Sequence, residues 1–355
     1  MDLNAKIYVA GHRGLVGSAI ERRLQQVGYR NIITQTHTEL DLRNQSDVAA
    51  FFKHERPDYV LLAAAKVGGI IANNTYKAEF LYDNLMIASN VIEQSYKYGV
   101  TKLINLGSSC IYPKFAAQPI PESALLGGEL ESTNEPYAIA KIAALKLCRY
   151  YHEQYGFNAI SLMPTNLYGS NDNYNLETSH VLPALIRKMF LGKALREGNV
   201  NFLRKDISLV SLGYGCDDAA RNAETITEIA AVLEKSGITS DAVTLWGSGL
   251  IRREFLHADD IADAAVFFLE NHTAEDIGEI LNIGTGRDLP IVELAERIRR
   301  AVGFEGKLEF DRSKPDGTPR KVLDVSRAAA LGWQYKTSLE EGLDRVIKEY
   351  AQARK

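Results

Sequence analysis

The fold of this chain is decided near its N-terminus by the stretch Lys6-Ile7-Tyr8-Val9-Ala10-Gly11-His12-Arg13-Gly14-Leu15-Val16-Gly17. Its first part is a short apolar run with β-branched residues, which is typical of a buried strand. Glycines then recur at every third position, and a helical apolar pattern of Val16, Ile20 and Leu24 begins there. Strand, glycine turn and helix in this order predict dinucleotide binding, because glycines let backbone N–H groups approach a pyrophosphate. We expect the whole turn, from Gly11 to Gly17, to contact the cofactor.

Strands and helices continue to alternate as far as about residue 170. Apolar runs predict further strands at residues 31–36, 59–63, 102–107, 158–163 and 280–283. Such alternation predicts an α/β fold with a doubly wound parallel sheet of the Rossmann type. We expect residues 1–170 to form this cofactor domain, with strand and helix returns near residues 245–270. Residues 171–355 are expected mainly to form a smaller C-terminal substrate-binding lobe over the carboxyl edge of the sheet.

The composition of the 355 residues excludes several classes of protein. Hydrophobic residues make up 46% and charged residues 24%, as in an ordinary globular protein, and the net charge of -4 offers no long-range attraction to nucleic acid or an anionic membrane. Cys110, Cys148 and Cys216 match no zinc pattern, so we expect no metal and a reducing, cytoplasmic setting. The longest apolar run, residues 59–71, is too short to span a bilayer, and no signal peptide is expected.

A catalytic pair is predicted at Tyr137 and Lys141. Asn134 and Pro136 favour a helix start just before them, so residues four apart lie on one helical face. A lysine ammonium beside a phenol stabilises the phenolate, which predicts a lowered pKa for Tyr137. Such a tyrosine can give a proton to a carbonyl oxygen while hydride reaches the carbon. Ser108, at the end of a predicted strand, would add a second hydrogen bond to that oxygen.

The second predicted strand ends without the acidic residue that usually binds the ribose 2′-hydroxyl of NAD. Its tip reads Thr34-Gln35-Thr36-His37, and no acid follows before Glu39. This favours NADP, since His37 can partly neutralise a 2′-phosphate. Asp41 and Leu42 are expected near the adenine, or else Asp41 caps the turn before Asn44. Loops at the ends of later strands add Leu106, Gly107, Ser108, Ser109, Lys141, Pro164, Thr165, Asn166 and Leu167 to the expected cofactor site.

Beyond single motifs, the chain resembles the GDP-L-fucose synthases, a family of extended short-chain dehydrogenase/reductases whose glycine turn has this spacing. The resemblance is carried by the glycine turn and by Ala63-Ala64-Ala65-Lys66-Val67-Gly68-Gly69-Ile70, Leu106-Gly107-Ser108-Ser109-Cys110-Ile111-Tyr112-Pro113-Lys114, Thr133-Asn134-Glu135-Pro136-Tyr137-Ala138-Ile139-Ala140-Lys141, Met163-Pro164-Thr165-Asn166-Leu167-Tyr168-Gly169 and Ser313-Lys314-Pro315-Asp316-Gly317-Thr318-Pro319-Arg320-Lys321. It covers nearly the whole chain except residues 194–243, an expansion over the compact members of the family.

The resemblance implies a specific reaction, the NADPH-dependent 3,5-epimerisation and 4-reduction of GDP-4-keto-6-deoxy-D-mannose to GDP-L-fucose. A C4 ketone acidifies the protons at C3 and C5, so an acid and a base are needed on opposite faces of the ring. The resemblance assigns these roles to Cys110 and His180, and places His180 beside the cofactor as well. Ser108 and Tyr137 would then stabilise the enolate oxygen.

The same resemblance implies that Lys188, Trp246, Arg253 and Asp316 hold the GDP-sugar. Lys188 stands where other members have arginine, which loses the bidentate geometry of a guanidinium. The family also implies a homodimer through the long helices near residues 76–98 and 137–155. In the sequence, only helix length and the apolar residues Ile87, Val91 and Leu145 hint at that interface.

Several alternatives remain at this stage. A reductase or epimerase for another GDP-4-keto sugar, such as a GDP-6-deoxyheptose, would keep every cofactor residue. A 4,6-dehydratase would need acids at Ser109 and Cys110, and a UDP-sugar 4-epimerase has no use for a pair like Cys110 and His180. Intact Ser108, Tyr137 and Lys141 disfavour a non-catalytic NADP sensor. The expansion can cover the sugar, alter specificity, contact another subunit or have no role in the reaction.

Overall fold

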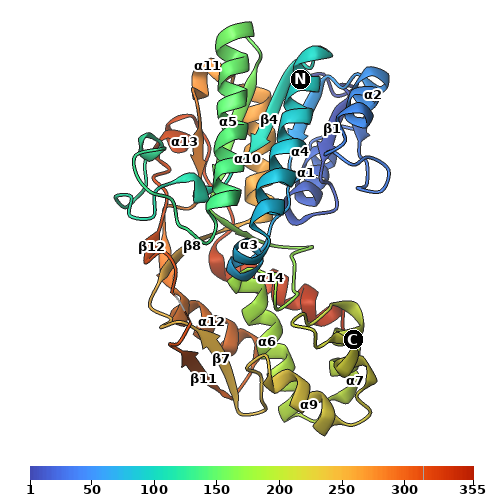
Figure 1. Ribbon diagram of the computed structural model, residues 1–355, viewed down its shortest axis with the longest axis vertical. Coiled ribbons are helices and arrows are strands. Elements are labelled where there is room, and N and C mark those ends of the chain that lie inside the picture. The colour runs from blue at the N-terminus through green and yellow to red at the C-terminus, as the bar shows by residue number, and fades with distance from the viewer. Residues whose placement is uncertain (315) are drawn as a thin grey trace.

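The computed structural model describes residues 1–314 and 316–355. Pro315, which belongs to the motif at residues 313–321, lies outside the described part. Figure 1 shows two lobes, a larger upper one that holds the N-terminus and a smaller lower one that holds the C-terminus. None of the helices in the described residues combines the length and apolar character needed to cross a membrane.

A six-stranded parallel sheet forms the centre of the upper lobe, in the order β2-β1-β3-β4-β5-β9. The strands are β1 (Ile7–Ala10), β2 (Ile32–Ile33), β3 (Tyr59–Leu62), β4 (Lys102–Leu106), β5 (Ala159–Pro164) and β9 (Leu281–Ile283). Their order reverses between β1 and β3, and open α/β sheets bind ligands at such a reversal, beyond the carboxyl ends of the strands. The predicted doubly wound α/β fold is confirmed.

Helices cover both faces of this sheet because successive strand residues point to opposite sides. Ile7 and Val9 of β1 pack on one face with α1 (Leu15–Gln26) and α10 (Ala258–Asn271). Tyr8 and Ala10 pack on the other face. The helices of that face are α2 (Gln45–Glu55), α4 (Lys77–Lys97) and α5 (Glu135–Tyr155). Thus α10 and β9, although late in the sequence, complete the upper lobe.

The lower lobe is built on α6 (Val181–Arg196), α12 (Ile291–Val302) and α14 (Leu339–Gln352). Its core contains buried residues of α6 and α12 such as Ile186, Leu294 and Ile298. Strands β7 (Ala242–Trp246) and β11 (Lys307–Asp311) pair beside it, and a small sheet lies between the lobes, formed by β6 (Asn166–Tyr168), β8 (Arg252–His257), β10 (Asp288–Pro290) and β12 (Arg320–Lys321). Short elements complete the chain: α3 (Ile70–Thr75), α11 (Ala274–Ile277), α13 (Ser326–Ala330) and the 3-10 turns η1 (Ser109–Ile111) and η2 (Glu122–Ala124).

The expansion at residues 194–243 is folded into the lower lobe. It contributes α7 (Val200–Leu209), α8 (Asp217–Asn222) and α9 (Ile226–Glu234). These helices pack in a core that they share with Leu191 of α6 and that includes Leu203, Ile229 and Leu233. A fully buried ion pair joins Arg187 Nη2 of α6 to Asp206 Oδ2 of α7 at 2.8 Å. Arg354 Nε, near the end of the chain, donates to Asp206 Oδ1 at 2.6 Å. These contacts fix the expansion to α6 and to the C-terminal residues.

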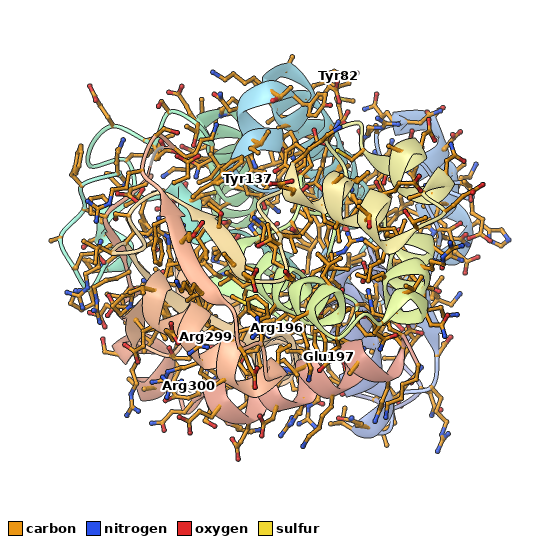
Figure 2. All side chains as sticks on the ribbon, turned by 90° about the horizontal axis from the view of Figure 1, so that it is seen from below. Tyr82, Tyr137, Arg196, Glu197, Arg299 and Arg300 are labelled. Carbon is orange, nitrogen blue, oxygen red and sulfur yellow. The ribbon has the colours of Figure 1, made fainter. Side chains whose placement is uncertain are left out.

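Two of the three residues taken as a hint of a dimer face lie elsewhere. Val91 and Leu145 are fully buried within the upper lobe, and Ile87 is partly buried against the same core. The exposed apolar side chains of α4 and α5 are instead Tyr82, Tyr96, Ile139, Tyr150 and Tyr155. Tyr82 lies at the outer edge of the molecule (Figure 2). The sequence hint was wrong because helix periodicity alone does not say which apolar stripe faces the sheet.

Candidate active site

A single cleft of about 1520 Å³ holds most of the predicted site residues. The carboxyl ends of β1, β3, β4 and β5 form one wall, and α6, β7 and β8 form the other. Every site residue predicted from the sequence lines this cleft except His12 and Arg13. Arg13 is exposed, and its charge helps to keep the pKa of Glu39 low, after the hydrogen bonds from Thr36.

The glycine turn has the shape that a dinucleotide needs. Gly11 has φ +87°, and a Cβ there would lie 2.7 Å from the backbone nitrogen of Ala64. At Gly17 a Cβ would lie 2.1 Å from the carbonyl oxygen of Gly11. A Cβ at Gly14 would lie at an ordinary 3.5 Å from the carbonyl oxygen of Gly11, and Gly14 is the N-cap residue of α1, whose first turn receives no side-chain cap within the described residues. Free N–H groups at a helix N-terminus suit a diphosphate, so the turn fits a dinucleotide cofactor.

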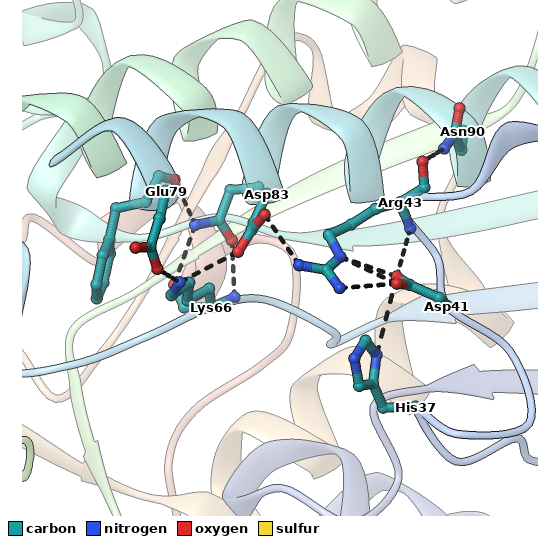
Figure 3. A network of polar contacts seen from close by, with 9 residues as sticks. His37, Asp41, Arg43, Lys66, Glu79, Asp83 and Asn90 are labelled. Atoms are coloured by element: carbon teal, nitrogen blue, oxygen red, sulfur yellow. Dashed lines mark hydrogen bonds and ion pairs between the residues drawn. The ribbon is translucent and has the colours of Figure 1, made fainter. Parts of the chain in front are cut away.

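A network of alternating charges joins His37, Asp41, Arg43, Asp83 and Lys66 (Figure 3), and all five residues line the cleft. Arg43 Nη2 binds Asp41 Oδ2 at 2.7 Å, and Arg43 Nη1 binds Asp83 Oδ1 at 3.2 Å. The hydrogen bonds from Arg43 lower the pKa of Asp41 to about 2. His37 Nδ1 lies 3.9 Å from Asp41 Oδ1, and Lys66 Nζ lies 3.2 Å from Asp83 Oδ2. The carboxylate of Asp41 is therefore ionised and already held by a guanidinium.

Tyr137 and Lys141 share one face of α5, as their spacing predicts. Lys141 Nζ lies 5.7 Å from the centre of the Tyr137 ring and donates to the carbonyl oxygen of Leu106 at 2.8 Å. Burial lowers the pKa of Lys141 to about 8. Burial, followed by the nearby Cys110, raises the pKa of Tyr137. The predicted lowering of the Tyr137 pKa is therefore wrong, and the phenol is protonated.

Ser108, Cys110 and His180 meet the cleft from both lobes. Ser108 Oγ accepts a hydrogen bond from the backbone N–H of Cys110 at 3.3 Å, at the start of η1. Burial raises the pKa of the Cys110 thiol, with Lys321 as the largest opposing influence. His180 is the N-cap residue of α6 and lines the cleft. Burial between the cleft walls lowers the pKa of its imidazole, and the charge of Lys321 lowers it further. A neutral thiol and a neutral imidazole result.

The two residues before His180 pack against Gly69, which lies in the loop after β3. The backbone N–H of Gly69 donates to the carbonyl oxygen of Thr178 at 2.8 Å. A Cβ at Gly69 would lie 2.6 Å from the carbonyl oxygen of Ser179. The loop after β3 thereby supports the segment that presents His180.

The substrate-side residues lie along the lower lobe. Lys188 Nζ donates to the carbonyl oxygen of Thr244 at 2.9 Å, and burial lowers its pKa to about 8. Burial also lowers the pKa of Arg253 to about 10. Asp316 Oδ1 accepts from the backbone N–H of Ser248 at 2.6 Å, beside the half-exposed Trp246. Two cations, an indole and a carboxylate thus share this part of the cleft.

The comparisons with known proteins agree with this geometry. The family model described as the NAD dependent epimerase/dehydratase family matches residues 7–208 and 208–284. GDP-L-fucose synthase 1 of Arabidopsis thaliana is 52% identical over 349 residues, which cover 98% of this chain and 94% of that protein. The chain belongs to the GDP-L-fucose synthase family of NAD-dependent epimerases and dehydratases.

Two solved structures from Campylobacter jejuni are similar over their whole length. A GDP-6-OMe-4-keto-L-xylo-heptose reductase is 39% identical with a TM-score of 0.92, and the match covers 99% of each chain. A GDP-mannoheptose C4 reductase with NADP bound is 39% identical with a TM-score of 0.86, again over 99% of each chain. The chain is thus an enzyme with an NAD(P)-binding fold.

Other residues of the cleft were not singled out from the sequence. Lys321 lies in a motif quoted for the resemblance, but only its position in β12, opposite Arg253 of β8, shows that it reaches the cleft. Arg43 follows Asp41 by two residues, and no motif in the sequence indicated that it lines the cleft. The expansion contributes Tyr214, Glu234, Lys235, Ser236 and Gly237 to the wall. Within the described residues, no group of three or more His, Cys, Asp or Glu is arranged to hold a metal ion.

Proposed function

We propose that this enzyme converts GDP-4-keto-6-deoxy-D-mannose to GDP-L-fucose by 3,5-epimerisation followed by NADPH-dependent 4-reduction. The observation that carries the proposal is the meeting of two sets of groups in one cleft. Ser108, Tyr137 and Lys141 form a set for reduction, and Cys110 and His180 form a set for proton exchange. A simple reductase has no need of the second set.

Proton exchange is assigned to Cys110 and His180. The neutral imidazole can remove a proton from a carbon next to the ketone, and the neutral thiol can deliver one to the opposite face. The hydrogens at C3 and C5 of the mannose-configured ring lie on the same face, so the same group removes both protons and the other delivers both. Proton exchange between the two groups or with solvent restores their proton states between the two inversions. The ammonium of Lys321 acts on both groups, because it favours the thiolate of Cys110 and disfavours the imidazolium of His180; it therefore assists proton release from each group and opposes proton uptake by the imidazole.

Reduction is assigned to Tyr137 with Ser108 and Lys141. A bound NADPH supplies the hydride for C4. The protonated phenol of Tyr137 donates to the C4 oxygen, and the Ser108 hydroxyl stabilises the negative charge on that oxygen as it develops. Lys141 is fixed by the Leu106 carbonyl, one helical turn from the phenol, where its charge stabilises the phenolate left behind.

We propose NADP rather than NAD as the cofactor. The acid that would bind a ribose 2′-hydroxyl is missing from the end of β2, where His37 lies with its side chain largely exposed. Asp41, the first acid of the cleft wall after it, is already bound by Arg43. A 2′-phosphate would thus meet cations instead of a free carboxylate. The Campylobacter jejuni GDP-mannoheptose C4 reductase, solved with NADP, supports this choice.

A second candidate is a reductase or epimerase for a GDP-4-keto-heptose. It is favoured by the TM-score of 0.92 to the GDP-heptose reductase, over 99% of each chain. The higher identity to the Arabidopsis thaliana GDP-L-fucose synthase favours the 6-deoxyhexose. A heptose carries one more carbon beyond C5 than a 6-deoxyhexose.

The experiment is NADPH oxidation at 340 nm with GDP-4-keto-6-deoxy-D-mannose, followed by identification of the sugar. GDP-L-fucose as product is expected, whereas GDP-rhamnose would mean reduction without epimerisation and would refute the roles of Cys110 and His180. In D₂O without NADPH, deuterium should enter at C3 and C5. Cys110→Ser and His180→Asn should slow this exchange, while Tyr137→Phe should slow reduction and spare the exchange.

We also propose a cytoplasmic homodimer. A working thiol at Cys110 requires a reducing setting, and all three cysteines are free. Tyr82 of α4 is 60% exposed and Tyr150 of α5 is 53% exposed, on two helices packed against each other. Exposed aromatic side chains on long adjacent helices suit a subunit interface. Light scattering should give a dimer for the wild type and a monomer for Tyr82→Glu with Tyr150→Glu.

A further inference from the structure

The turn that ends α9 forms part of the cleft wall. Glu234, Lys235, Ser236 and Gly237 line the cleft, and all four belong to the expansion. The backbone N–H of Thr244 donates to the carbonyl oxygen of Gly237 at 2.8 Å. Gly237 has φ +71°, and a Cβ there would lie 2.9 Å from the Thr244 Cβ. The turn is therefore fixed against β7, the strand that carries Trp246.

This turn lies far from the groups assigned to proton exchange. His180, Ala184 and Lys188 follow one another at intervals of four along α6, and all line the cleft. At a rise of 1.5 Å per residue, Lys188 lies about 12 Å along the helix from His180. Lys188 donates a hydrogen bond to Thr244, and Thr244 in turn donates one to Gly237 of the α9 turn. The α9 turn therefore lies at the end of the cleft that holds Lys188. Figure 1 shows α6 running from the junction of the lobes down towards α9.

A GDP-sugar has its base at the end opposite to the sugar, separated by a ribose and two phosphates. With the sugar ring between Cys110 and His180, the diphosphate reaches the cations Lys188 and Arg253. The base then comes to the wall made by the α9 turn and β7. Sugar carbons beyond C5 stay at the other end of the cleft.

The turn offers hydrogen-bonding groups that are not used by the protein. Glu234 is exposed to the cleft, and within the described residues its carboxylate has neither an ion pair nor a hydrogen bond. It is the last residue of α9, where the helix dipole disfavours a negative charge, so helix stability does not explain it. Ser236 Oγ is buried without a hydrogen-bond partner in the described part of the chain, which is costly unless a ligand provides one.

We propose that the expansion recognises the guanine base of the substrate through hydrogen bonds. The Glu234 carboxylate accepts hydrogen bonds from guanine N1–H and from the 2-amino group, and the Ser236 hydroxyl binds a polar atom of the base at the same wall. The inference rests on the proposed function, because it takes the ligand to be a GDP-sugar. It assigns residues 194–243 to selection of the nucleotide and not of the sugar.

The test is calorimetric binding of GDP and of inosine diphosphate, which lacks the 2-amino group, to the full-length protein. The variant is Glu234→Ala. The matched control is Glu224→Ala, an exposed glutamate of the same expansion outside the cleft. The wild type and the control should bind GDP about 10- to 100-fold more tightly than inosine diphosphate, as expected for a charge-assisted hydrogen bond. In Glu234→Ala the affinity for GDP should fall by a similar factor and the preference should approach one.

The outcomes separate this inference from the proposed function. If Glu234→Ala keeps the preference for GDP, the inference is overturned, while tight GDP binding leaves the proposed function intact. If the wild type binds GDP no better than ADP, the proposed function fails and the inference fails with it. At saturating GDP-4-keto sugar the kcat of Glu234→Ala should stay within about 3-fold of the wild type. The base is bound equally in the ground state and in the transition state, so losing this contact raises KM and leaves kcat unchanged. A loss in kcat with an unchanged KM would place Glu234 in the chemistry and would also overturn the inference.

Discussion

Replacing Lys188 by arginine should remove a pH dependence from nucleotide binding. The pKa of Lys188 is lowered to about 8 by burial, so the side chain is cationic below that pH and neutral above it. By the Henderson–Hasselbalch relation it is about nine-tenths charged at pH 7 and about one-tenth charged at pH 9. If only the charged form binds the diphosphate, the Kd for GDP should rise about 10-fold over this range. An arginine stays charged throughout, so Lys188→Arg should show no such rise.

The assay is calorimetric binding of GDP alone at pH 7, 8 and 9. Without sugar or cofactor, groups assigned to the chemistry do not contribute, and titration of GDP itself affects both proteins equally. Lys193→Arg is the matched control, because Lys193 lies on the same helix and donates to a backbone carbonyl, that of Val302, outside the cleft. It should keep the wild-type dependence. Equal pH dependence in wild type and Lys188→Arg would refute the placement of the diphosphate at Lys188.

Three further results are expected. Gly69→Ala should displace His180, because the new Cβ would lie 2.6 Å from the carbonyl oxygen of Ser179, the residue before it. The rate of deuterium exchange should then fall about 100-fold, and hydride transfer should fall less. Equal losses in the two rates would contradict this reasoning. Arg187→Leu leaves Asp206 as a buried charge with one guanidinium partner fewer, and should lower the free energy of unfolding by about 3–5 kcal/mol in urea titrations, whereas no change would argue against the ion pair. Since the pKa of Lys141 is about 8, single-turnover reduction should slow as the pH rises through that value, and a flat profile to pH 10 would exclude a role for its charge.

The upper lobe follows closely from sequence periodicity. Each apolar run that predicted a strand forms one, and the glycine turn lies where β1 passes into α1. Local rules suffice there because parallel strands are buried on both faces and each is bounded by a turn. Tyr137 and Lys141 also take the predicted arrangement, since a spacing of four within one helix fixes their relative position.

Properties that depend on long-range packing were not accessible in this way. The pKa of Tyr137 is set by burial and by Cys110, 27 residues earlier, so the helical neighbour Lys141 alone predicts the wrong direction. Lys321 joins Cys110 and His180 only through the pairing of β12 with β8. Burial of Val91 depends on which face of α4 meets the sheet. In each case the deciding partner comes from a distant part of the chain.

The chain has a negative net charge, yet its cleft holds cations as well as carboxylates, and the cations bear on the ligand. The chain as a whole carries a net charge of -4, yet Lys141, Lys188, Arg253 and Lys321 all line one cleft. Burial lowers the pKa of each of these four groups. Cations held in this way are stabilised by an anion that enters the cleft, and a nucleoside diphosphate brings its charge to the middle of the ligand, between base and sugar. On the proposed placement, Lys188 and Arg253 bind the diphosphate at the centre of the substrate, while Lys141 and Lys321 lie with the groups that act on the sugar. The groups at either end of the cleft, Glu234 at one and the pair of Cys110 and His180 at the other, would then decide which base is bound and what happens to the sugar.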